Sequence, residues 1–158
     1  MTVEEAYQTI PHERTLFDSS SSKMSQEEKE YLNTVFSLTD RALVVRVQTL
    51  QWLRSNRQIK LDNEKYDKIL SELKNLKAPN KLEKFHQPIV RAIETHKLFF
   101  EKWSKRNWFN YDIYGDEQVQ SSSADLKQAY NILIGLYPIE SEQNKKAFFD
   151  YLCALDFL

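Results

Sequence analysis

Apolar side chains recur at alternating spacings of four and three residues through segment 26–55. That spacing places them on one face of an α-helix. A second apolar stripe runs beside the first, interrupted by Arg46, which we expect to reach solvent or pair with an acid. Two adjacent stripes make a face that needs more than one neighbouring helix to cover it. The stripes are Tyr31, Val35, Leu38, Ala42, Val45, Thr49 and Trp52, and Leu32, Phe36, Thr39, Leu43, Leu50 and Leu53.

A second long helix is predicted from Asn80 to about Arg106, after the break at Pro79. Its length allows it to lie antiparallel to helix 26–55. We expect its central His96 to be partly buried and hydrogen-bonded rather than catalytic. The positions that share one face of this helix are Leu82, Phe85, Ile89, Ile93, His96, Phe100 and Trp103.

Four shorter helices are predicted over residues 2–10, 63–76, 123–137 and 141–154. All six predicted helices begin at a residue whose side chain can accept a hydrogen bond from the first turn. These starts are Thr2 with Glu5, Ser25 with Glu28, Asp62, Asn80 with Glu83, Ser122 with Asp125, and Ser141.

The predicted fold class is all-α: a bundle of four main helices with short additional helices and one long aromatic loop, residues 107–122. Residues 1–24 are expected to form a short helix and a serine-rich connection, and residues 25–158 a single helical-bundle domain. The chain holds only two glycines, Gly115 and Gly135. Two separated glycines exclude the P-loop and dinucleotide fingerprints and disfavour folds built from tight β-turns.

The aromatic loop is the first candidate for partner binding. Four aromatic rings fall within seven residues, directly after a helix end rich in bases. Monomeric proteins seldom expose so many rings together, so the loop packs over the bundle or meets a partner. We expect the first two rings to be packed anchors and the last two to be the contact edge. The predicted partner-binding residues are Trp108, Phe109, Tyr111 and Tyr114, with Lys102, Lys105 and Arg106.

The formal charge of −1 conceals three unequal segments. Residues 41–108 hold sixteen bases and seven acids, whereas residues 1–40 and 109–158 each hold eight acids and three bases. The basic centre can bind nucleic acid, but we favour acidic ends that fold back across it. Bases alternate with aromatic rings near residue 108, so nucleic-acid binding stays an alternative. The sequence contains no known nucleic-acid-binding motif.

A metal site has one candidate, the pair Glu83 and His86, which has the Glu-x-x-His spacing of di-iron bundles. Such sites need a second copy of the motif, and the chain has none. Glu83 also serves as the predicted capping residue facing Asn80. Covalent catalysis is disfavoured, because Cys153 lies among apolar residues near a helix C-terminus, where the dipole opposes a thiolate. We therefore expect no cofactor and no metal.

The sequence favours a non-catalytic helical interaction or adaptor module with a protein partner. The alternatives are a nucleic-acid-binding helical protein and, below it, a metal-dependent bundle enzyme. The apolar runs are too short to span a membrane. A lone cysteine and an N-terminus without signal-peptide features predict a cytoplasmic protein.

Overall fold

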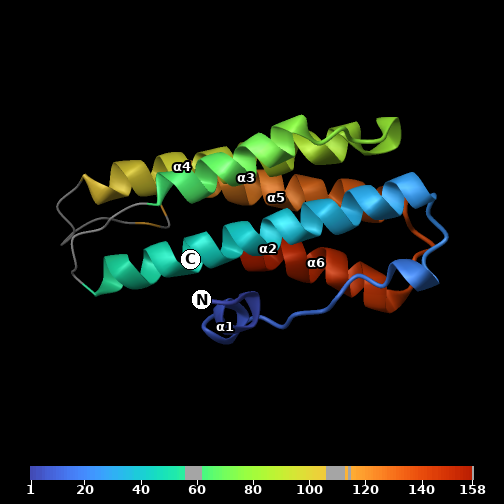
Figure 1. Cartoon of the computed structure of the whole chain (residues 1–158), viewed down its shortest axis with the longest axis horizontal. Coiled ribbons are helices and arrows are strands. Elements are labelled where there is room, and N and C mark those ends of the chain that lie inside the picture. The colour runs from blue at the N-terminus through green and yellow to red at the C-terminus, as the bar shows by residue number, and fades with distance from the viewer. Residues whose placement is uncertain (56–61, 106–112, 114, 158) are drawn as a thin grey trace.

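The computed structural model describes residues 1–55, 62–105, 113 and 115–157. Every regular element in these ranges is a helix, and Figure 1 shows successive long helices running antiparallel to one another. The predicted all-α bundle is confirmed. Its elements are α1 (Val3–Gln8), η1 (Ser19–Ser21), α2 (Gln26–Arg54), α3 (Asn63–Asn75), η2 (Asn80–Leu82), α4 (Glu83–Ser104), α5 (Glu117–Leu136) and α6 (Glu142–Asp156).

Local hydrogen bonds set most helix starts where the sequence predicts them. At α2, the Ser25 hydroxyl accepts from the Glu28 amide at 3.2 Å, and the Glu28 carboxylate accepts from the Ser25 amide at 3.0 Å. Thr2 and Glu5 form the same reciprocal box at α1. Asp62 and Ser141 cap α3 and α6. Because these contacts span three residues, the sequence alone reveals them.

The predicted cap of α4 is wrong. The Leu82 amide donates to the Pro79 carbonyl oxygen at 2.8 Å, which closes a 3-10 turn over residues 80–82. Asn80 therefore lies inside that turn, and α4 starts after it without a side-chain cap. Glu83 is left exposed at the first position of the helix.

The predicted start of α5 at residue 123 is also wrong. Asp116 is the cap: its carboxylate accepts from the amides of Gln118 at 2.8 Å and Val119 at 3.4 Å. Residues 117–122, predicted as loop, form the first turns of the helix. Ser122 is buried there, and its hydroxyl donates to the Val119 carbonyl. Serines have weak helix propensity, so packing against the bundle decides this segment.

The broad face of α2 is buried as predicted, because α1, α3, α4 and α6 all contact this helix. Both apolar stripes lie in the core except at the helix end, where Trp52 is exposed. The prediction for Arg46 is wrong: its side chain is buried inside the bundle, and among the described residues it forms no ion pair with an acid. The predicted face of α4 is buried along its whole length.

The N-terminal segment lies along α2 and α6 (Figure 1). Arg14 Nη2 donates to the Asp40 carboxylate on α2 at 2.7 Å, and the Tyr7 hydroxyl donates to the same group at 3.4 Å. The Asp18 amide donates to the Asn144 side chain on α6. These contacts join residues 1–24 to the bundle, and the division of the chain into residues 1–24 and a single domain 25–158 stays a prediction.

Candidate binding groove between α5 and α6

The predicted aromatic contact residues Trp108, Phe109, Tyr111 and Tyr114, and the base Arg106, lie outside the described residues. The assignment of anchors and contact edge therefore stays a prediction. Lys102 and Lys105 are described. Lys102 is partly buried and forms an ion pair with Asp116. Lys105 is exposed at the C-terminal end of α4.

The two residues of the candidate metal pair lie in different surroundings. Glu83 is exposed, whereas His86 is half-buried with its Nδ1 2.7 Å from the Tyr31 hydroxyl oxygen. Burial lowers the pKa of His86, so its ring is neutral at pH 7. Across the described ranges, no group of three or more metal-ligating side chains comes together.

Bases of the central segment pair with acids, many within the same segment. Arg41 pairs with Glu72 at 2.6 Å, and Lys97 pairs with Asp67 at 2.5 Å. The acidic C-terminal part supplies Asp125, 3.0 Å from Arg91, as well as the partner of Lys102. These ion pairs reduce the positive electrostatic potential expected from the excess of bases in residues 41–108.

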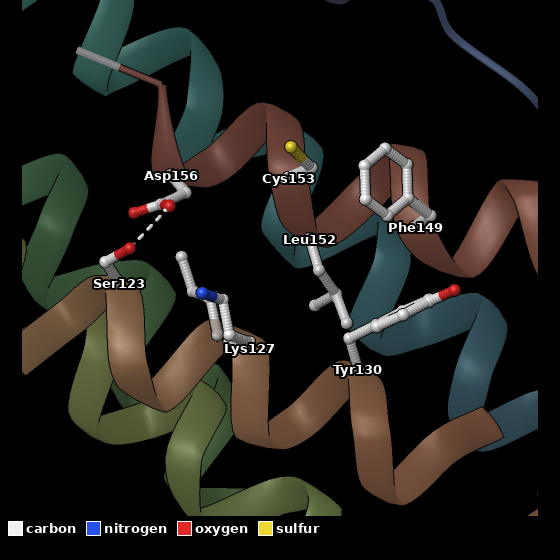
Figure 2. A pocket seen from close by; sticks show the side chains of 8 residues that line it. Ser123, Lys127, Tyr130, Phe149, Leu152, Cys153 and Asp156 are labelled. Carbon is white, nitrogen blue, oxygen red and sulfur yellow. Dashed lines mark hydrogen bonds between the residues drawn. The ribbon is translucent and has the colours of Figure 1, made fainter. Parts of the chain in front are cut away.

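The structure brings together a set of residues that the sequence did not indicate. A hollow of about 90 Å³ lies between α5 and α6, and we call it the α5–α6 groove. Figure 2 shows side chains of both helices converging on it. Its lining is Ser123, Leu126, Lys127 and Tyr130 from α5, and Phe149, Leu152, Cys153 and Asp156 from α6.

Each helix contributes four groove residues at the same spacing: a first residue, then those three, four and seven positions later. This spacing lines one helix face. The predicted helix bounds hid this spacing, because helix 141–154 left out Asp156 and the predicted start of α5 placed Ser123 at a helix end. Nothing in the sequence shows that the two faces meet.

The groove is apolar at one end and polar at the other. At the apolar end, the rings of Tyr130 and Phe149 meet edge to face, with centroids 5.6 Å apart. Leu126 and Leu152 are buried beneath them. At the polar end, the Ser123 hydroxyl donates to the Asp156 carboxylate at 2.8 Å.

Burial raises the pKa of two groups in the groove, Asp156 and Cys153. Burial raises the pKa of Asp156, although Ser123, Arg46 and Lys127 oppose that shift. Burial also raises the pKa of the Cys153 thiol, as do the carboxylates of Asp156 and Asp150. A thiol among carboxylates is a poor nucleophile at neutral pH. The groove therefore offers no activated thiol nucleophile at Cys153.

A wider hollow of about 710 Å³ adjoins the groove and shares four residues with it. It extends toward the N-terminal segment at Pro11 and His12 and toward Phe157 after α6. Near it, the His12 ring stacks on Phe149 with centroids 6.0 Å apart. The shared residues are Ser123, Lys127, Cys153 and Asp156.

No protein-family model, curated protein or solved structure matches this chain. The groove must therefore be interpreted from its own chemistry. Among the described helices, none has a stretch long and apolar enough to cross a lipid bilayer.

Proposed function

We propose that this protein is a non-catalytic interaction module whose α5–α6 groove receives an apolar side chain from a protein partner. The observation that carries this proposal is the pairing of two matched helix faces around a hollow with exposed aromatic area. Phe149 is 45% exposed although it is a large apolar residue. Aromatic side chains at a pocket rim contribute a large share of binding energy in protein interfaces.

The groove by itself has room for one side chain, and it reaches the volume of a small-molecule pocket only together with the adjoining hollow. The groove's volume of about 90 Å³ is below the roughly 300–1,000 Å³ of ordinary small-molecule pockets. The adjoining hollow gives room for the partner's flanking residues. The Lys127 ammonium group can donate a hydrogen bond to the partner's backbone, and the Asp156 carboxylate can accept one.

The electrostatics support a non-enzymatic role. The raised pKa of Cys153 removes the obvious nucleophile of the groove. Lys97 and Lys102 form ion pairs with acids, which leaves fewer free cations for the phosphates of a nucleic acid. We also infer a cytoplasmic location, which the single cysteine supports.

The test places a photo-crosslinking phenylalanine analogue at Phe149 in living cells. The matched control places it at Leu98 of α4, which is 52% exposed and outside the groove. We expect a defined protein adduct from position 149 only, with the crosslink on an apolar side chain. A synthetic peptide of that segment should then bind the purified protein. Phe149→Glu should weaken binding by tenfold or more, on the order of an interface anchor, and Leu98→Glu should not.

Two outcomes would overturn the proposal. One is the same adducts from both positions, which indicates random collision. The other is peptide binding that Phe149→Glu leaves unchanged, which places the contact elsewhere. In either case, circular dichroism of both variants must first show the parent helix content.

A further inference from the structure

Three polar side chains meet inside the bundle, away from the groove. They are Arg46 on α2, Tyr66 on α3 and His96 on α4, with exposed fractions of 2%, 0% and 3%. Arg46 Nη1, the Tyr66 hydroxyl and His96 Nε2 have no hydrogen-bond partner among the described residues. Buried polar atoms in folded proteins nearly always have a partner, so three such groups in one region are a place where an acceptor can bind.

Two of the three side chains pack against one aromatic ring, and the charge of Arg46 acts on the third, His96. The guanidinium Cζ of Arg46 lies 5.5 Å from the centroid of Phe100. The Tyr66 ring lies 6.5 Å from the same ring, centroid to centroid. His96 is one helical turn before Phe100 on α4, so both share a helix face. The cluster therefore draws on three helices at one level of the core.

All three groups are available as hydrogen-bond donors at neutral pH. Burial lowers the pKa of Arg46 to about 10, which leaves the guanidinium charged. Burial raises the pKa of Tyr66, so its hydroxyl keeps its proton. Burial and the Arg46 charge hold the pKa of His96 well below 6.5, so the ring is neutral and one tautomer carries its hydrogen on Nε2.

The charge of Arg46 is not balanced by a direct partner. Its Nε donates to the Phe157 carbonyl oxygen at 2.8 Å, which is a neutral acceptor. In the described ranges, no carboxylate lies within ion-pair distance of the guanidinium. Asp156 acts on it only from further away, and that carboxylate accepts from Ser123. A buried cation without a counter-charge is unfavourable.

We propose that Arg46, Tyr66 and His96 bind a small monovalent anion of halide size inside the bundle. An anion accepts from all three donors and neutralises the guanidinium. A water molecule satisfies the hydrogen bonds but leaves the charge. The three residues do not line the α5–α6 groove, and the proposal does not rest on the function proposed for that groove.

The first experiment measures thermal unfolding of the full chain in sodium chloride and in sodium gluconate at equal ionic strength. Gluconate is too large to enter the core, so it controls for the general screening of charges by salt. We expect a higher melting temperature in chloride, saturating with concentration, by roughly 3–6 °C at tenfold above Kd. Tyr66→Phe keeps the ring and removes one donor, so it should reduce this difference. Tyr130→Phe, in the groove, should keep it.

The second experiment locates the ion directly. Crystals grown in bromide should show an anomalous peak within hydrogen-bond distance of Arg46 Nη1 and of the Tyr66 or His96 donor. Equal melting temperatures in the two salts would overturn the proposal, as would a chloride effect that Tyr66→Phe leaves intact. A water molecule at the cluster in the bromide crystals would overturn it as well.

Discussion

The side chain of Asn144 hydrogen-bonds both backbone polar groups of Asp18. Asn144 Oδ1 accepts from the Asp18 amide at 2.9 Å, and Nδ2 donates to the Asp18 carbonyl oxygen at 3.1 Å. The same Nδ2 donates to Glu140 at 2.8 Å, and Glu140 accepts from the Ser22 hydroxyl at 3.0 Å. One buried amide on α6 thus holds the connection between α1 and α2.

Asn144→Ala is expected to destabilise the protein by about 1–3 kcal/mol, because it leaves buried polar groups without partners. Urea unfolding measures this change. Hydrogen exchange should also accelerate across residues 11–24. Gln143→Ala, at the exposed neighbouring position, should stay within about 0.5 kcal/mol of the parent. Equal effects of the two substitutions would show that the amide does not hold the segment.

Asp116→Ala should destabilise the protein by about 1–2 kcal/mol, the usual range for loss of a helix cap. The substitution also removes the ion pair with Lys102. Asp116→Asn keeps an oxygen for the α5 amides, so it should recover part of the loss. Thermal unfolding of both variants measures this. The control is Asp125→Ala on the same helix, whose pair with exposed Arg91 should contribute less than about 1 kcal/mol.

The lowered pKa of His96 predicts that the protein loses stability in mild acid. Its pKa in the folded protein is held well below 6.5 by burial and by Arg46, whereas the unfolded chain has the ordinary value. Below pH 6.5 the unfolded state therefore binds a proton that the folded state does not. The free energy of unfolding should fall by up to about 1.4 kcal/mol per pH unit from this group.

The measurement is urea unfolding between pH 7.5 and about 5 for the parent, His96→Gln and His86→Gln. His96→Gln should flatten the slope. His86→Gln should flatten it less, because His86 is only half-buried. Carboxylates with raised pKa, such as Asp40, titrate alike in all three proteins and cancel in the comparison. An unchanged slope in His96→Gln would contradict the assignment.

Cys153 should react slowly with iodoacetamide in the native protein. Burial and two carboxylates raise the pKa of its thiol, which lowers the fraction of reactive thiolate at a given pH. Mass spectrometry at pH 8 should show alkylation on the order of tenfold slower than in denaturant. Because the chain holds a single cysteine, the adduct reports this site alone. Equal rates would mean that the thiol is accessible and unperturbed.

Helix types, most starts and the buried stripes were predictable, because they depend on residues a few positions apart. The Ser25 and Glu28 box needs only the geometry of one turn. The predicted helix starts failed at Asn80 and Ser122. In both places several short-range patterns competed, and contacts with other helices or the turn at Pro79 decided between them.

The candidate sites were less predictable. The sequence marked Arg46 and His96 as polar positions on apolar faces, but it did not indicate that they share one region with Tyr66. The predicted contact residues around Trp108 lie outside the described ranges. No sequence pattern indicated the α5–α6 groove, because two helix faces with matched spacing form a site only when they face each other.

The sequence by itself determined an all-helical chain, the approximate bounds of its helices and the faces that they bury. Periodicity and capping determine these features through contacts within about four residues along the chain. Tertiary structure alone decided that Asn144 holds Asp18, that Arg46 lies in the core near Tyr66 and His96, and that α5 and α6 enclose a groove. Each of these features joins residues far apart in the chain, and only the relative placement of whole helices brings them together.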